Sequence, residues 1–215
     1  MCVQKLDVDP TLSIKRQINI KNFLNQSDQY RSLTGELLIR YHILKELKLK
    51  NEEVLFEYNK YGKPFLIIES DYFFNLSHSS SAVVCITDNQ QVGIDVELIK
   101  PIDIKGFKKV FSPDELVYIM KQKNKFKGFY EIWTAKESFL KMLGKGLTVP
   151  LLSFSIHEGD NNLFKIRQPY FKCDPFLKTY HVSDDYIICA CSIRKELPNK
   201  VNEISFSDLI SQFTN

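Results

Sequence analysis

FYEIWTAKESFLKMLGKGL, residues 129–147, carries the strongest helical pattern of the chain. Its apolar residues recur at the spacing of a helix that packs one face against a core: Phe129, Ile132, Trp133, Leu140 and Leu143. Two glycines follow, Gly144 and Gly146, and glycine is the residue that most often ends a helix. The stretch therefore predicts an amphipathic core helix that ends near residue 144.

Three charged residues of this helix have different surroundings on the helical wheel. Glu137 and Lys141 are four residues apart and share a face, whereas Lys136 projects among the apolar side chains. An unpaired ammonium is costly to bury, so Lys136 needs an anionic partner, or its aliphatic stem runs along the surface with its ammonium in water. A surface pair between Glu137 and Lys141 is the ordinary alternative to a functional role.

Composition limits the class of protein. With 44% hydrophobic and 13% aromatic residues, the 215-residue chain can build one or two real cores, which excludes a disordered protein. The 29 basic and 26 acidic residues nearly cancel, to a net charge of +3. So small a charge does not indicate nucleic-acid binding by the whole molecule.

The five cysteines have no CxxC spacing that would indicate a zinc or redox site, and Cys189 and Cys191 are expected on one face of a strand. The chain begins without a basic region followed by an apolar run, and no stretch has the length of a membrane span. We therefore expect a cytoplasmic protein with reduced thiols.

The first helix is predicted over residues 32–47, with Arg31 at its start, where backbone amides favour anions. Residues 61–64, Tyr-Gly-Lys-Pro, are expected to form a turn that displays Lys63 on a loop. The earlier residues show no clear pattern, and only Lys15 or Arg16 stand out there as basic candidates.

Three short runs, 72–76, 82–87 and 92–97, predict an antiparallel meander. In the last run Val92, Ile94 and Val96 face one way, and Asp95 and Glu97 face the other, beside a glycine that leaves room. Further strands are expected over 151–157, 163–167, 177–182 and 186–193. Both parts of the chain thus run from a helix into hairpins, which suggests an internal duplication into residues 1–100 and 101–215.

Residues 105–127 hold seven lysines against two acidic residues. Such a run is either a solvated face or a docking site for an acidic partner. Three apolar residues among the lysines favour docking, because they would supply the apolar centre of an interface: Phe107, Val110 and Phe111.

Three polar groups call for one explanation: Asp95 and Glu97 on a strand, Glu137 with its lysines on a helix, and the Asn-Leu-Ser-His-Ser segment at 75–79. Carboxylates that converge from two elements suit Mg²⁺, which binds few protein ligands and leaves positions for phosphate oxygens. Nearby lysines would neutralise those phosphates. Each group alone is a weak signal, and a lone histidine is more often structural.

With these motifs the chain resembles the 4'-phosphopantetheinyl transferases of the surfactin-synthetase type. Residues 92–97, VGIDVE, match that family's G-I-D-x-E segment, and residues 133–141, WTAKESFLK, match its W-x-x-K-E-x-x-x-K segment. Residues 62–64, GKP, and 75–79, NLSHS, fit its two upstream motifs. The motifs stand in the family's order, and the resemblance extends from about residue 31 to residue 193.

The resemblance implies an α+β fold of two similar α/β-sheet halves that form an intramolecular pseudo-dimer, with the active site in the cleft between them. Such a fused pseudo-dimer has less need to self-associate, so we expect a monomer. Asp95, Glu97 and Glu137 would hold Mg²⁺ with the coenzyme A pyrophosphate, and Lys136 and Lys141 would lie near that pyrophosphate. The adenine and 3'-phosphate pocket would be lined by Tyr61, Gly62, Lys63, Pro64, Ser77 and His78, with help from Arg31 and Ser32. The segment before Arg31 matches the family poorly. The family often adds basic contacts there, for which Lys15 or Arg16 are the candidates in this chain.

The implied reaction moves the phosphopantetheine arm of coenzyme A to a serine of an apo carrier protein and releases adenosine 3',5'-bisphosphate. Glu137 is the expected base, directly or through water, and Glu97 is the alternative. The carrier would dock near residues 105–127. Its pathway, fatty-acid, nonribosomal peptide or polyketide synthesis, stays open.

Two other functions remain open at this point. A metal-dependent phosphodiesterase or nuclease could use the same carboxylates and lysines, although the nearly balanced charge speaks against a polyanion groove. A non-catalytic module that only binds carrier proteins is the other, and the presence of all three acidic residues argues against it.

Overall fold

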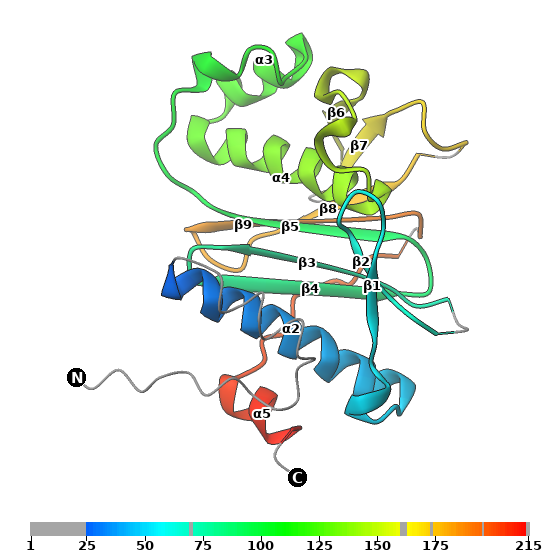
Figure 1. Ribbon diagram of the computed structural model, residues 1–215. Helices are drawn as coiled ribbons and strands as arrows, with labels where there is room; N and C mark the ends of the chain where they lie inside the picture. The colour runs from blue at the N-terminus through cyan, green and yellow to red at the C-terminus, as the bar shows by residue number, and fades with distance from the viewer. Residues whose placement is uncertain (1–24, 69–70, 160–162, 173, 195, 214–215) are drawn as a thin grey trace, which may run out of the picture. The chain divides into compact units, whose positions relative to one another are not determined.

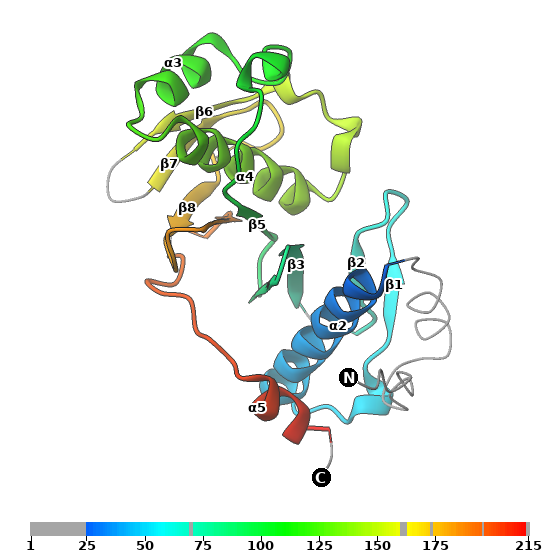
Figure 2. The ribbon, with the colours of Figure 1, turned by 90° about the vertical axis from the view of Figure 1, so that its left-hand side faces the viewer.

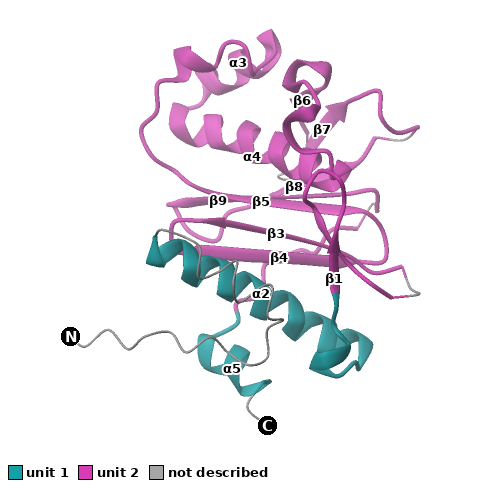
Figure 3. Ribbon diagram, viewed as in Figure 1, with its two compact units in different colours: residues 1–55, 204–215 teal, residues 56–203 magenta. Residues whose placement is uncertain are grey.

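The computed structural model describes residues 25–68, 71–159, 163–172, 174–194 and 196–213. The chain forms two compact units, residues 1–55 with 204–215, and residues 56–203 (Figure 3). Lys15 and Arg16 lie outside the described residues. The predicted halves 1–100 and 101–215 and the predicted monomer stay predictions.

In the first unit, helix α2 (Gln26–Leu47) is capped by Asn25, and a short 3-10 helix η1 (Asn51–Glu53) and helix α5 (Phe206–Ser211) complete the described part. Helix α2 begins before residue 32, where the sequence predicted its start. The prediction missed the first turn because that turn is polar and shows no apolar repeat. Arg31 therefore lies in the second turn, where it pairs with Asp28, and the prediction that it stands at the helix start was wrong.

Every strand found in the described ranges lies in the second unit (Figures 1 and 3). Two hairpins come first: β1 (Phe56–Tyr58) with β2 (Pro64–Leu66), and β3 (Phe73–Ser79) with β4 (Ala82–Asp88). A five-stranded antiparallel sheet has the order β5-β9-β8-β7-β6. Its strands are β5 (Val92–Leu98), β6 (Ser155–Glu158), β7 (Leu163–Arg167), β8 (Phe176–Tyr180) and β9 (Tyr186–Ser192).

Strand β5 is the point where the predicted meander was wrong. It pairs with β9 rather than with β4, and it meets β3 through side chains. Asn75 Oδ1, Ser77 Oγ and Ser79 Oγ accept hydrogen bonds from the backbone amides of Ile94, Val96 and Leu98, at 2.8, 3.4 and 3.2 Å. Each pair is separated by 19 residues, so β3 and β5 run in parallel. Polar side chains thus form the seam between two separate sheets.

Helix α4 (Lys125–Leu143) crosses one face of the large sheet, and helix α3 (Pro113–Lys121) lies on its outer side (Figures 1 and 2). Asn124 caps the start of α4, and Gly144 ends it in the left-handed conformation at φ 65°, as predicted. Three 3-10 helices flank this pair: η2 (Ile104–Phe107), η3 (Gly146–Thr148) and η4 (Leu151–Ser153). No helix within the described ranges is long and apolar enough to cross a membrane.

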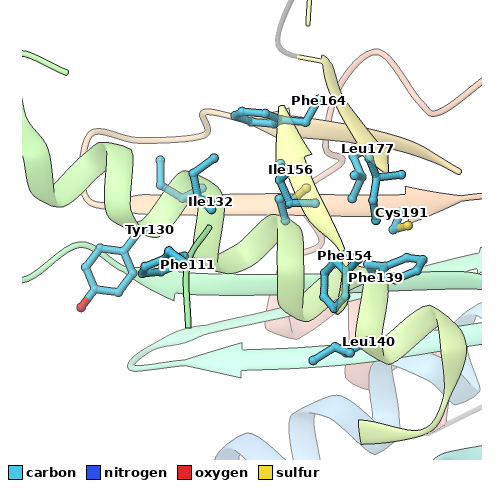
Figure 4. Packing of buried hydrophobic residues seen from close by; sticks show 14 of the residues in the cluster. Phe111, Tyr130, Ile132, Phe139, Leu140, Phe154, Ile156, Phe164, Leu177 and Cys191 are labelled. Atoms are coloured by element: carbon cyan, nitrogen blue, oxygen red, sulfur yellow. The ribbon is translucent and has the colours of Figure 1, made fainter. Parts of the chain in front are cut away.

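The main core lies between α4 and the sheet (Figure 4). Of the predicted apolar arc, Phe129, Ile132 and Leu140 are almost fully buried, and Trp133 and Leu143 are partly buried against the same cluster. Phe139, which was not in that arc, is also fully buried. Cys189 and Cys191 are free thiols that face this core from one side of β9, as the alternation predicted. Burial raises the pKa of Cys189 to about 12, so this thiol is not a nucleophile at neutral pH.

At Gly93 the backbones of α4 and β5 approach each other closely. A Cβ at this position would lie 2.0 Å from the Ser138 backbone oxygen and 2.4 Å from the Met142 backbone nitrogen. The room that glycine leaves is therefore filled by the helix backbone, not by a ligand. Asp95 and Glu97, on the same face of β5, consequently point toward the side of α4 that carries Glu137 and Lys141.

The three apolar residues predicted to form an interface centre in the lysine-rich segment pack against the core instead. Phe111 is only 2% exposed, and Phe107 and Val110 pack against the same cluster. The prediction that these three form an exposed apolar centre was wrong, because each finds aromatic or aliphatic neighbours inside. Phe107 and Phe111, for example, make ring contacts with Phe129.

Lys136 has an internal partner. Its ammonium lies 2.9 Å from Glu115 Oε1, and both side chains are 0% exposed. It also donates to the carbonyl oxygens of Leu151 and Phe154, while Glu115 accepts from the backbone amides of Ser112 and Ile156. Burial lowers the pKa of Lys136, and Glu115 opposes that shift. The ion pair thus joins α3, α4 and the start of β6.

Breaking this pair from one side should destabilise the protein. Lys136→Met or Glu115→Gln should each reduce the free energy of unfolding by about 3–5 kcal/mol, because a buried partner loses its counter-charge or its acceptor. The double variant should lose less than the sum of the two. Urea unfolding of the parent and the three variants measures the coupling, and strictly additive losses would contradict a direct pair.

Candidate functional site

A group of charged side chains lies where β3, β5 and α4 meet. Lys141 Nζ on α4 lies 2.6 Å from Asp95 Oδ1 on β5 and donates to Ser77 Oγ on β3 at 2.7 Å. Ser77 Oγ in turn donates to Asp95 Oδ1 at 2.8 Å. Three elements that are far apart in sequence therefore meet in one polar triangle.

Two further carboxylates belong to this group. Glu97 accepts a hydrogen bond from Ser79 Oγ at 2.8 Å, and Glu137 lies on α4 one turn before Lys141. Burial raises the pKa of Glu137, and the charges of Asp95 and Glu97 raise it further, against the opposing effect of Lys141. The structure thus brings the three predicted carboxylates close enough to repel one another.

The other two carboxyls are shifted in the same direction. Burial raises the pKa of Asp95, and Lys141 and Ser77 oppose it. The pKa of Glu97 is raised by burial, with a smaller contribution from Asp95, and Ser79 opposes the shift. A group of partly desolvated carboxylates is typical of a functional site, because it leaves negative charge that a cation would stabilise.

The donor set fits a hard cation. Asp95 Oδ2 is buried and accepts no hydrogen bond from the described residues, so it leaves an acceptor for a further ligand. Oxygen donors from Asp95, Glu97 and Glu137 are those that Mg²⁺ prefers. Across the described ranges, however, no three acidic, histidine or cysteine side chains already stand in a coordinating arrangement.

The turn that joins β1 and β2 holds Tyr61, Gly62 and Lys63, and Pro64 is the first residue of β2. Gly62 adopts φ 87°, which explains the glycine, and Tyr61 is 42% exposed. Lys63 is not displayed as predicted. Its ammonium donates to the carbonyl oxygens of Lys141, Met142 and Val92, and burial lowers its pKa to about 8.

Ser77 and His78 lie on opposite faces of β3, because successive side chains alternate along a strand. Ser77 is buried beside Asp95, whereas His78 is exposed. Ser79, which sequence reasoning did not single out, binds Glu97. The polar alternation of Asn75, Ser77 and Ser79 was the available signal.

Three predicted site residues do not belong to the group of carboxylates around Lys141. Lys136 is buried in an ion pair with Glu115, which argues against its predicted position near a pyrophosphate. Arg31 and Ser32 belong to the first unit, so their relation to the group is not fixed by the structure. Sequence reasoning also missed Glu115 and Asn59, whose side chain donates to the backbone oxygen of Gly144.

Most of the chain matches known protein families. A profile of the 4'-phosphopantetheinyl transferase superfamily matches residues 91–191, and one of the N-terminal part of 4'-phosphopantetheinyl transferases matches residues 8–90. The structure of a holo-[acyl-carrier-protein] synthase from Thermotoga maritima is a weak neighbour, with a TM-score of 0.42 and 19% identity over 49% of this chain and 64% of that chain.

Two relatives are similar over nearly their whole length. The 4'-phosphopantetheinyl transferase gsp of Aneurinibacillus migulanus is 35% identical, with 94% of this chain and 85% of the relative covered. The 4'-phosphopantetheinyl transferase Sfp of Bacillus subtilis is 33% identical, with 93% of this chain and 90% of the relative covered. This chain, with its α+β fold, therefore belongs to the 4'-phosphopantetheinyl transferase family.

Proposed function

We propose that this protein transfers the 4'-phosphopantetheine arm of coenzyme A to a serine hydroxyl of an apo carrier protein and releases adenosine 3',5'-bisphosphate. Family membership gives the reaction class. The observation that supports it in this chain is the group of three carboxylates with Lys141, because transfer of a phosphoryl-linked arm needs both a base and positive charge at the phosphates.

In this proposal Lys141 lies beside the pyrophosphate and stabilises the charge that grows on the leaving phosphate. Ser77 holds the Lys141 ammonium toward that site. Glu137 accepts the proton of the carrier serine as its oxygen attacks the β-phosphorus, and its raised pKa makes it a stronger base than an ordinary glutamate. Glu97 is the alternative base, and its pKa is also raised.

Asp95, Glu97 and Glu137 would hold Mg²⁺, and the unpartnered Asp95 Oδ2 supports this assignment. Bound Mg²⁺ supplies positive charge to the pyrophosphate oxygens. The adenine and 3'-phosphate end of coenzyme A would meet Tyr61, Gly62, Pro64, Ser77 and His78, with Arg31 and Ser32 as further candidates.

The reaction itself is tested by incubating the protein with coenzyme A, Mg²⁺ and an apo carrier protein, followed by mass spectrometry of the carrier. A carrier heavier by one phosphopantetheine group supports the proposal. Cleaved coenzyme A with an unmodified carrier would indicate a phosphodiesterase instead. A carrier that binds without change, while coenzyme A stays intact, would indicate a non-catalytic binding module.

Each carboxylate of the group should be needed for transfer. Asp95→Asn, Glu97→Gln and Glu137→Gln should each lower kcat about a hundredfold or more, because each removes a charged oxygen ligand or the base. In the parent, Mg²⁺ with coenzyme A should raise the melting temperature, and each variant should lose part of that shift. Glu158→Gln, on the exposed end of β6, is the matched control. Near-normal turnover at saturating Mg²⁺ would remove that residue from the set.

His78 is proposed to contact the 3'-phosphate rather than the reacting atoms. His78→Ala should raise KM for coenzyme A more than it lowers kcat, and the penalty should shrink with dephospho-coenzyme A, which lacks that phosphate. His157→Ala on β6 is the control. Equal penalties with both substrates would show that His78 does not bind the 3'-phosphate.

The lysine-rich segment 105–127 is proposed to dock the carrier protein. Lys105, Lys108, Lys109 and Lys121 are exposed around α3. Because Phe107, Val110 and Phe111 face the core, the apolar centre of such an interface would instead be Val117 and Met120 on α3, which are 51% and 54% exposed.

Reversing Lys108, Lys109 and Lys121 to glutamate should raise KM for an acidic carrier and weaken its salt dependence, since rim charges act on the encounter rate. The KM for coenzyme A should not change. The control reverses Lys165, Lys172 and Lys200, which are exposed elsewhere and give the same change in net charge. If both triple variants match the parent at low and moderate ionic strength, the segment is only a solvated face.

A further inference from the structure

The turn between β1 and β2 makes a set of contacts that the transfer reaction does not by itself require. Asn59 Nδ2 donates to the Gly144 backbone oxygen at 2.8 Å, and Asn59 Oδ1 accepts from the amides of Tyr61 and Lys63. The backbone amide of Asn59 also donates to the Lys63 oxygen at 2.9 Å. Asn59 thus shapes the turn and attaches it to the end of α4 at the same time.

The Lys63 ammonium makes the second attachment. It donates to the backbone oxygens of Lys141 and Met142 in the last turn of α4, at 2.6 and 3.3 Å, and to that of Val92 at the start of β5, at 3.2 Å. Carbonyls in the last turn of a helix lack intrahelical partners, and the helix dipole makes that end negative. A cation is therefore favourable at this place even though it is largely withdrawn from water.

The donors of Lys63 are fully used in this arrangement. An ammonium has three N–H donors, and three backbone oxygens accept them. Binding a phosphate with the same group would require breaking at least one of these bonds. Burial lowers the pKa of Lys63 to about 8. The Lys63 ammonium has therefore largely lost contact with water, and the three backbone carbonyls take the place of that water.

Lys141 is held at both ends as a result. Its backbone oxygen is bound by Lys63, and its side chain lies on Asp95 and Ser77. Lys63 also binds Val92, on the same strand as Asp95. The turn thus ties the last turn of α4 to the strand that carries the carboxylate partner of Lys141.

We infer that Lys63 is a positioning residue, which together with Asn59 fixes the last turn of α4 on β5 so that the Lys141 ammonium stays at Asp95. This assignment replaces the expectation that Lys63 binds the 3'-phosphate. The catalytic consequence rests on the role of Lys141 in the proposed function. The structural consequence, a last turn of α4 held by the β1–β2 turn, does not.

The kinetic test compares Lys63→Met, which keeps the length of the side chain but cannot donate, with the parent. Lys63→Met should lower kcat about tenfold or more, because small displacements of a catalytic group are costly. The factor should be the same with coenzyme A and with dephospho-coenzyme A, and KM for coenzyme A should change little. Asn59→Ala, which leaves the ammonium in place, should cause a smaller loss with the same pattern. Lys60→Met, on the exposed side of the same turn, is the control.

Hydrogen–deuterium exchange of the ligand-free protein gives a second readout that needs no activity. The amide of Gly144 donates to the oxygens of Leu140 and Lys141, so exchange in residues 140–147 reports on the last turn of α4. It should become faster in Lys63→Met and Asn59→Ala and stay unchanged in Lys60→Met.

The outcomes separate the two ideas. A preference for coenzyme A over dephospho-coenzyme A that collapses in Lys63→Met would assign Lys63 to the 3'-phosphate and overturn the positioning role. Unchanged exchange in residues 140–147 would overturn it as well. If the parent transfers nothing to any apo carrier, the proposed function fails, while the exchange experiment still decides whether the turn holds α4.

Discussion

The close approach of α4 to β5 at Gly93 is the constraint on which the site depends. The helix backbone occupies the space that any side chain at this position would fill. At that separation, Asp95 on the strand and Lys141 on the helix form a direct ion pair at 2.6 Å, and the charges of Asp95 and Glu97 come close enough to help burial raise the pKa of Glu137. A larger residue at position 93 would move the helix away and separate both groups.

The two lysines of the WTAKESFLK segment show how one helix serves packing and chemistry. Lys136 points into the core and is neutralised by Glu115, a buried pair whose loss leaves an uncompensated charge. Lys141 lies on a neighbouring face of the same helix, where its side chain remains 29% exposed beside Asp95. Only the second ammonium lies beside the carboxylate group, although both residues belong to the same family motif.

The sequence predicted the features that depend on local spacing. The apolar arc of α4, its end at Gly144 and the common face of Asp95 and Glu97 follow from periods of 3.6 and 2. The carboxylate group was predicted through motifs rather than through spacing alone. Contacts between distant residues were missed. The pairing of β5 with β9, the Glu115 partner of Lys136 and the carbonyl partners of Lys63 depend on tertiary structure, which no local pattern encodes.

The seam between β3 and β5 has a consequence for how this family can vary. A backbone ladder tolerates almost any side chain, because its hydrogen bonds use groups that every residue carries. Here the amides of Ile94, Val96 and Leu98 depend on one asparagine and two serines. Two of those hydroxyls also bind Asp95 and Glu97. The serines that join the two sheets are thus the same residues that orient the carboxylates. A substitution at either serine would therefore weaken the contact between the sheets and disturb the site at the same time.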